Sequence, residues 1–260
     1  MTSKHIDKIN ERRFSFSSLS TFENCKHSFF LTYLDVERER KSNIFSEFGT
    51  LCHEILEMYF RNYFEADELP EAYLRAWDRT MKSPPPGFIK KKKYLDDGYR
   101  FFQYFDFDKS KYEPIFIEDK IDVDLTEWKI VVKPDLVLRE LSTGKLILLD
   151  YKTSLVFKSG VLDKDKLNGY KRQMLIYSLF LKTKGINIDE IWLWFLRDSE
   201  NQFVKFSTSE DLEDKAEKWI SKIVGKIKEE DEFAPKEKVD FFCKNLCGVS
   251  EWCSKFNDKK

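Results

Sequence analysis

The stretch from Trp128 to Lys152, WKIVVKPDLVLRELSTGKLILLDYK, decides the fold of this 260-residue chain. Residues 128–139 and 145–151 are rich in Val, Ile and Leu, and the Ser142-Thr143-Gly144 turn between them predicts a β-hairpin. The run from Leu146 to Leu149 is continuously apolar, which is typical of a strand covered on both faces. The stretch therefore predicts the buried centre of a β-sheet.

Helical patterns precede this stretch, and helices and strands alternate after it. We expect helices over 14–34, 48–64, 71–81, 90–105, 164–184 and 212–228, and further strands over 115–117, 121–125, 188–197 and 203–206. The pattern predicts an α/β fold in a single domain spanning 1–260. Its parts would be a helical N-terminal part (1–111), an α/β core (112–208) and a closing helix with a cysteine-rich tail (209–260).

The composition indicates a globular chain without an obvious partner. Apolar residues make up 42% of it and charged residues 35%, and 45 basic against 46 acidic residues give a net charge of −1, so any phosphate-binding surface would have to be a local patch. The polar N-terminus has no signal peptide, and no run approaches the roughly 18 apolar residues of a membrane span. We therefore expect a soluble, cytoplasmic protein with no membrane contact, whose five cysteines stay reduced.

Two carboxylates and a lysine form the most informative set. Asp135 follows Lys133-Pro134, and Asp150-Tyr151-Lys152 comes after fourteen intervening residues. A hairpin can bring both acids to one ion, and strand alternation puts Asp150 and Lys152 on the same face. Carboxylates are the hard ligands that Mg²⁺ or Mn²⁺ prefers, and an ammonium beside them can polarise a water and offset phosphate charge. The set predicts phosphodiester hydrolysis.

Asp-Tyr-Lys alone is a common tripeptide, and a strand ending in Asp and Lys usually means only that it has reached solvent. Three further features support a site. His53 ends the sequence Gly49-Thr50-Leu51-Cys52-His53, which we expect to open a helix and to place the histidine on its first turn. Asp135 follows a proline near a strand end. Gln173 and Tyr177 share a helix face at i,i+4 spacing, and Tyr170 lies on the same stripe.

This set resembles the PD-(D/E)xK nuclease superfamily, specifically its RecB-like branch, which carries G-x-x-x-H, a PD-type acid, (D/E)-x-K and Q-x-x-x-Y in this order. The match spans Gly49 to Tyr177. The resemblance implies a restriction-endonuclease-like mixed sheet flanked by helices. It also implies metal ligation by His53, Asp135, Asp150 and the backbone carbonyl of Tyr151, a water held or activated by Lys152, and DNA contacts from Gln173 and Tyr177.

A second group contains four cysteines. Cys243, Cys247 and Cys253 fall within eleven residues, and Cys25 lies near the other end of the chain. Four thiolates suit either a tetrahedral zinc ion or a [4Fe–4S] cluster, and their spacing does not decide between the two. Cys52, beside His53, falls outside this group, and we expect it to be a packing residue.

The sequence also resembles a subgroup of RecB-like nucleases that includes the AddB helicase–nuclease subunit and CRISPR-associated exonucleases. These proteins hold a [4Fe–4S] cluster with one early and three late cysteines, and residues 16–25 are similar to their opening. The resemblance implies iron–sulfur ligation by the four cysteines, with zinc as the alternative. One departure is that three residues separate Cys243 from Cys247, where the subgroup typically has two.

Lys90 to Lys93, followed by Tyr94, Tyr99, Phe101 and Phe102, is a possible surface for single-stranded nucleic acid, although aromatic residues at helical spacing more often belong to a core. The leading hypothesis is a metal-dependent DNA exonuclease acting on single strands or duplex ends. A catalytically idle DNA-binding module and an RNA-processing nuclease with structural zinc are the alternatives. No G-x-x-x-x-G-K-[ST] motif is present, so unwinding would need a partner such as a helicase or a CRISPR or recombination factor.

Overall fold

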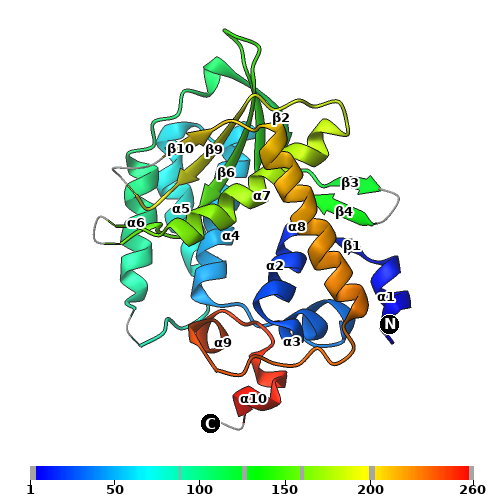
Figure 1. Ribbon diagram of the computed structural model, residues 1–260. Helices are drawn as coiled ribbons and strands as arrows, with labels where there is room; N and C mark the ends of the chain where they lie inside the picture. The colour runs from blue at the N-terminus through cyan, green and yellow to red at the C-terminus, as the bar shows by residue number, and fades with distance from the viewer. Residues whose placement is uncertain (1–3, 88, 125–127, 159–160, 199–202, 258–260) are drawn as a thin grey trace. The chain divides into compact units, whose positions relative to one another are not determined.

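The computed structural model describes residues 4–87, 89–124, 128–158, 161–198 and 203–257 (Figure 1). The chain forms two compact units. The first comprises Met1–Asn43, Ile121–Val132 and Asp214–Lys260, and the second comprises Ile44–Lys120 and Lys133–Glu213. The second unit contains the predicted hairpin and the acidic residues.

The second unit is built on a mixed five-stranded sheet. Its strands are β2 (Tyr112–Ile117), β5 (Leu136–Glu140), β6 (Leu146–Lys152), β9 (Glu190–Phe195) and β10 (Phe203–Phe206), in the order β10-β9-β6-β5-β2. Strands β6 and β9 are parallel and the other pairs are antiparallel. The predicted hairpin joins β5 to β6, and Gly144 takes the φ of 76° that its turn requires. The α/β fold with a mixed sheet is therefore confirmed.

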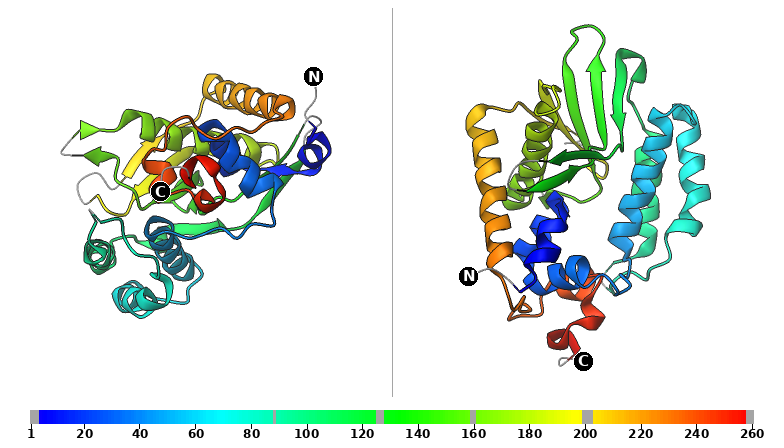
Figure 2. Two further views of the ribbon diagram at one scale, coloured as in Figure 1. Left: turned by 90° about the horizontal axis from the view of Figure 1, so that it is seen from below. Right: turned by 90° about the vertical axis from the view of Figure 1, so that its right-hand side faces the viewer.

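Helices cover both faces of this sheet (Figure 2). The helices of the unit are α4 (Ile44–Phe60), α5 (Leu69–Thr80), α6 (Lys91–Gln103) and α7 (Lys164–Lys182), with short 3-10 turns at Ala66–Glu68 and Lys109–Lys111 and a small hairpin of β7 (Phe157–Lys158) and β8 (Val161–Leu162). Helices α4, α5 and α6 share a buried core with Leu149 and Trp194. Helix α7 contacts the opposite side chains, Asp150, Lys152 and Phe195. The apolar run of β6 is buried between these layers, as its sequence predicts.

The first unit holds both ends of the described chain. Strands β1 (Arg13–Phe14), β4 (Lys129–Val132) and β3 (Ile121–Asp124) form a small sheet in that order. Its other elements are α1 (Ile6–Glu11), α2 (Phe16–Asn24), α3 (Lys26–Phe29), a π-helical turn (Phe30–Leu34), α9 (Phe241–Asn245), a 3-10 turn (Ser250–Trp252) and α10 (Ser254–Asn257). Helix α8 (Glu210–Glu229) begins in the second unit and continues in the first.

The expectation of one strand over 128–139 is wrong, because the chain leaves the strand conformation at Lys133-Pro134-Asp135. Residues before this break pair with β3 and β1, and residues after it pair with β2 and β6. Pro134 has no backbone N–H to donate to a sheet ladder. Leu125, the last residue of the strand expected over 121–125, lies outside the described residues.

Two helix predictions also need correction. The helix expected over 14–34 is interrupted at Cys25, which has an extended backbone (φ −157°, ψ 109°) and whose sulfur accepts a hydrogen bond from Ser28 N. The helix expected over 48–64 begins at Ile44 and ends at Phe60, so His53 lies in its third turn and not its first. Among the described residues, no helix is both long and apolar enough to cross a membrane.

The packing of α5 against α6 depends on a glycine. A Cβ on Gly98 would collide with Cζ and the hydroxyl of Tyr73, which is fully buried and donates a hydrogen bond to Tyr94 O (2.9 Å). Gly98→Ala should therefore lower the free energy of unfolding by about 1–3 kcal/mol in urea denaturation, as overpacking a core typically does.

Gly169→Ala is the matched control. Gly169 lies inside α7 with nothing within 4 Å of its Cβ position, so alanine should raise the free energy of unfolding, by up to about 1 kcal/mol, through helix propensity alone. Equal stabilities for the two variants would contradict this account of the α5–α6 packing.

Candidate active site

Three strand ends of the second unit meet at one edge of its sheet. Because β5 is antiparallel to both neighbours, its first residues lie beside the last residues of β2 and of β6. Leu136 pairs with Ile117 on one side and with Leu149 on the other. Asp135, Glu118 and the Asp150–Lys152 segment are thereby brought to the same edge.

Asp135 is held by the backbone on either side of it. Its Oδ2 accepts a hydrogen bond from Tyr151 N at 2.7 Å, and its carbonyl oxygen accepts one from Glu118 N at 3.0 Å. The residue is only 8% exposed, and this burial raises the pKa of its carboxyl group. Asp135 is therefore a fixed, poorly solvated carboxylate whose Oδ1 takes no part in the bond to Tyr151.

His53 reaches the same edge from α4. Its Nδ1 lies 3.2 Å from Glu118 Oε1 and 3.5 Å from Asp135 Oδ1, and its Nε2 lies 3.2 Å from the carbonyl oxygen of Tyr151. Burial alone would lower the His53 pKa, but the charge of Asp135 and the bond to Glu118 outweigh it and raise the pKa to about 9. Without a metal ion, the imidazole is therefore protonated at neutral pH.

Asp150 and Lys152 point to the side of the sheet that α7 covers. Lys152 Nζ lies 2.5 Å from Asp150 Oδ2 and donates to Gln173 Oε1 at 2.9 Å. Gln173 Nε2 lies 3.4 Å from Asp150 Oδ1 and 3.3 Å from the hydroxyl of Tyr177. The ring centroid of Tyr170 is 4.6 Å from Lys152 Nζ. Helix α7 thus fixes the ammonium through an amide and an aromatic face.

The charges of this edge balance one another. Three acids, Glu118, Asp135 and Asp150, contact three bases, His53, Lys133 and Lys152. Burial by itself lowers the pKa of Lys152, but Asp150 and Asp135 outweigh it and raise that pKa. Each buried carboxylate therefore has a cationic neighbour, which buried charges require.

The donor atoms fit a divalent ion. His53, Glu118 and Asp135 offer ligand atoms that lie within 4.8 Å of one another, the one such group of three or more among the described residues. Neighbouring ligands of an octahedral ion at about 2.1 Å lie about 3.0 Å apart. The separation of His53 Nε2 and Tyr151 O, at 3.2 Å, is close to that value. Carboxylate, imidazole and carbonyl donors together suit Mg²⁺ or Mn²⁺.

Glu118 was missed by the sequence reasoning. It carries no spacing signature, and its place in the site depends on the pairing of β2 with β5. One signal was available: an acidic residue directly follows the predicted strand over 115–117. Every site residue that the sequence indicated in the second unit lies at this edge, with Gln173 and Tyr177 turned toward Lys152 and Asp150.

The first unit brings the four cysteines together. Cys25, Cys243, Cys247 and Cys253 all line one pocket, with Ser28, Leu31 and Phe242 among its other walls. Ser28 Oγ lies 3.7 Å from Cys247 Sγ, and burial raises the pKa of Cys247. Cys52 is fully buried in α4, in the second unit.

The spacing of these sulfurs differs from that of a single-ion site. No three of the four lie within 4.8 Å of one another, since the one group of that compactness in the described chain is the histidine–carboxylate group. Sulfurs around one zinc ion, at about 2.3 Å each, would lie about 3.8 Å apart. Four thiols lining one pocket are a donor set for either a zinc ion or an iron–sulfur cluster.

The lysine and aromatic stretch that begins at Lys90 does not form a stacking surface. Tyr94, Phe101 and Phe102 are buried in the core. Lys92 and Lys93 form ion pairs with Asp96 and Asp97, one turn further along α6.

The family model for the PD-(D/E)XK nuclease superfamily matches residues 13–254. The chain belongs to the PD-(D/E)XK nuclease superfamily. Membership indicates a metal-dependent nuclease with a nucleic acid as its substrate class, and PD-(D/E)XK nucleases use divalent metal ions.

The other comparisons add no functional information about this PD-(D/E)XK nuclease. A search of curated proteins gives no match. A solved structure described as "Crystal structure of SSO0001" aligns over 92% of this chain and 95% of its own, at 15% identity and a TM-score of 0.35. At that score the likeness carries no argument.

If His53 is a metal ligand, metal binding should depend on pH through its imidazole. A ligand must lose its proton before it can bind a metal ion, and the His53 pKa is about 9. The Mn²⁺ affinity measured by calorimetry should therefore rise by up to about tenfold per pH unit from pH 7 toward 9, and then level off. In His53→Gln this dependence should flatten. A wild-type affinity that is constant between pH 7 and 9 would show that His53 is not a ligand.

Proposed function

We propose that this protein is a Mg²⁺- or Mn²⁺-dependent deoxyribonuclease, and specifically an exonuclease acting on single-stranded DNA or duplex ends. The observation that carries the proposal is the buried ion pair of Asp150 with Lys152 at one sheet edge, next to the buried carboxylate of Asp135 that Tyr151 N holds. Phosphodiester hydrolysis requires cation-binding oxygens and a fixed positive charge near the phosphate, and this edge offers both.

The metal-binding residues in this proposal are His53, Asp135, Asp150 and the carbonyl of Tyr151. A divalent ion bound there would supply Lewis-acid stabilisation of phosphate charge and a more acidic water. Asp135 is oriented for this role by the hydrogen bond from Tyr151 N. Asp150 is oriented by Lys152 and Gln173.

Lys152 acts as a donor in this scheme. Asp150 and Asp135 raise its pKa, and its ammonium would hold or activate a water and offset charge on a phosphate oxygen. Gln173 and the Tyr170 ring restrict its position, which lowers the entropic cost of aligning it with the substrate. Gln173 and Tyr177, on the same face of α7, would contact the DNA near the scissile phosphate.

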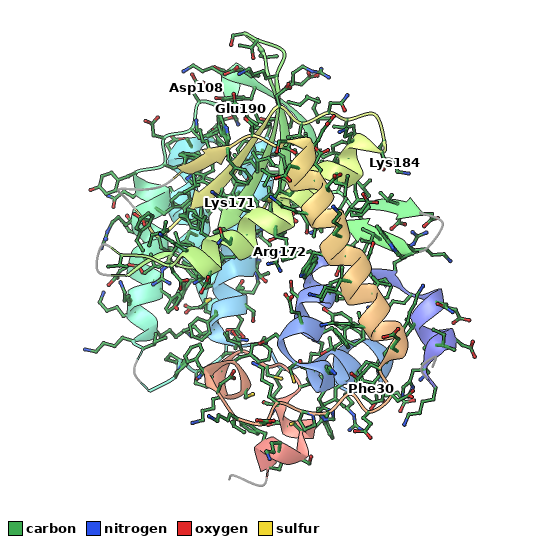
Figure 3. The ribbon with its side chains drawn as sticks, in the orientation of Figure 1. Phe30, Asp108, Lys171, Arg172, Lys184 and Glu190 are labelled. Atoms are coloured by element: carbon green, nitrogen blue, oxygen red, sulfur yellow. The ribbon has the colours of Figure 1, made fainter. Side chains whose placement is uncertain are left out.

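The nucleic-acid substrate class rests on membership of the nuclease superfamily, since the net charge of the chain is only −1. Lys171 and Arg172 lie on α7 directly before Gln173 (Figure 3). The choice of DNA over RNA and of exonuclease over endonuclease rests on the resemblance to RecB-like nucleases. The resemblance to helicase-linked and CRISPR-associated members of that branch also supports a protein partner such as a helicase or a CRISPR or recombination factor.

The cysteine pocket is proposed to hold a structural [4Fe–4S] cluster, with zinc as the alternative. None of the four cysteines belongs to the acidic group, so the proposed role of the cluster is structural. Cys25 and Cys243 are far apart in sequence, and closing so long a loop through a metal centre should stabilise the folded state.

The nuclease proposal is tested with fluorescently labelled single-stranded DNA, a duplex with free ends, a closed circle and a matched RNA. Wild type should degrade the first two with Mg²⁺ or Mn²⁺ and should stop on addition of EDTA. Asp150→Asn should abolish cleavage, because a carboxylate ligand is lost. Lys152→Met should lower kcat by about 10²–10³-fold with little change in KM.

Asp165→Asn is the control, because Asp165 lies in the first turn of α7 and takes no part in the site. It should leave the rate unchanged. Wild-type rates in Asp150→Asn would refute the assigned site. Preferential cleavage of the RNA would show that RNA, and not DNA, is the substrate.

The cluster proposal predicts a brown protein. Wild-type protein purified without oxygen should absorb broadly near roughly 400 nm and contain about four irons per chain. Cys25→Ala and Cys247→Ala should lose iron and become sensitive to protease, whereas Cys52→Ala should keep its iron, because Cys52 lies outside the pocket. A colourless wild type with stoichiometric zinc would refute the cluster, and one with no metal would refute any metal centre at these cysteines.

A further inference from the structure

Glu118 is a buried acid that the proposed roles leave unused. Its side chain is 9% exposed, and its backbone has a φ of 56°, which is uncommon for a residue with a Cβ. Glu118 N donates to the carbonyl oxygen of Asp135 at 3.0 Å, so its place is fixed relative to an assigned metal ligand. The surrounding structure holds this residue in an unfavourable conformation, which is often found at functional sites.

Both carboxylate oxygens of Glu118 are occupied by cationic side chains. Oε1 lies 3.2 Å from His53 Nδ1, and Oε2 lies 2.5 Å from Lys133 Nζ. Asp135 Oδ1 is further from the same imidazole nitrogen, at 3.5 Å. Glu118 is therefore the closest acceptor for a proton on His53 Nδ1.

The other imidazole nitrogen faces a different group. His53 Nε2 lies 3.2 Å from the carbonyl oxygen of Tyr151. When the imidazole is neutral, only one of its nitrogens carries a proton. If that proton stays on Nδ1, bonded to Glu118, then the Nε2 lone pair points toward Tyr151 O, and the two atoms form neighbouring donors for one cation.

We propose that Glu118 is the positioning residue for His53: its carboxylate accepts the Nδ1–H of the imidazole and so presents Nε2, unprotonated, to the divalent ion. Lys133 holds the carboxylate in place through its second oxygen. Histidine ligands commonly gain their tautomer and orientation from such an outer carboxylate. This inference rests on the proposed metal-dependent function of the site.

The test measures Mn²⁺ binding to the otherwise unaltered full-length protein, by the electron paramagnetic resonance signal of free Mn²⁺. Glu118→Gln keeps the side-chain volume but removes the charge, and it should weaken the Mn²⁺ affinity by about 10- to 100-fold. Asp119→Asn removes the same charge one residue away, at a half-exposed position, and should bind Mn²⁺ as wild type does. Thermal melting without metal would verify that each variant is folded.

A double-mutant cycle separates positioning from direct ligation. In a His53→Ala background, Glu118→Gln should cost no further affinity, because the residue through which it acts is gone. A further loss in that background would show that Glu118 is itself a ligand and would overturn the inference. An unchanged affinity in the single Glu118→Gln variant would also overturn it.

The nitrogen-15 chemical shifts of an imidazole report which of its nitrogens carries the proton. A purely structural role of Glu118 would leave these shifts of His53 unchanged. The chain has three histidines, so the His53 signals can be assigned with the His53→Ala variant. In Mg²⁺-saturated wild type, Nδ1 of His53 should be protonated and Nε2 bare. In the metal-free proteins, at a pH where His53 is neutral, wild type should keep the proton on Nδ1 and Glu118→Gln should show mixed tautomers, and a wild-type spectrum of the variant would count against the proposal.

The Mn²⁺ affinity of an Asp150→Ala variant distinguishes failure of this inference from failure of the proposed metal site. If wild type binds no Mn²⁺, or binds it as well without the Asp150 carboxylate, the proposed metal site fails. If Asp150→Ala loses affinity and Glu118→Gln does not, only the positioning role of Glu118 fails.

Discussion

The burial of Asp135 and Asp150 at one sheet edge is the constraint on which the rest of the second unit depends. The two residues are 8% and 2% exposed, and a buried carboxylate without a cationic partner is costly. His53 supplies that charge to Asp135 and Lys152 supplies it to Asp150, while Lys133 pairs with the neighbouring acid Glu118. Placing all of these groups together explains why α4, the hairpin and α7 converge at this edge. On metal binding at this site, the ion would replace a proton on the imidazole of His53.

The break at Pro134 makes this arrangement possible. It ends β4 and starts β5, and Asp135 lies between the two strands. Its carboxylate accepts a hydrogen bond from Tyr151 N, and its carbonyl oxygen accepts one from Glu118 N. The same break separates residues of the first unit from residues of the second. One proline therefore affects both the division of the chain and the geometry of the acidic group.

Local patterns were enough to predict the hairpin, the buried strand β6, and the common face of Gln173 and Tyr177, because each depends on neighbours within a few residues. The break at Cys25 and the start of α4 at Ile44 could not be read this way. Cys25 has an extended backbone that no helical periodicity reveals, and Ile44 lies four residues before the first residue expected to be helical. Glu118 was missed for a different reason. Its partners, His53 and Lys133, are 65 and 15 residues away, and only the pairing of β2 with β5 brings them together.

We propose that these side chains together form one divalent-metal site. Crystals of the protein grown with Mn²⁺, with diffraction data collected at the manganese absorption edge, would test it most directly. We predict an anomalous peak in contact with His53, Asp135, Asp150 and the carbonyl oxygen of Tyr151, with Lys152 still beside Asp150. A peak elsewhere on the protein, or a fully occupied manganese ion that contacts neither Asp135 nor Asp150, would contradict this assignment.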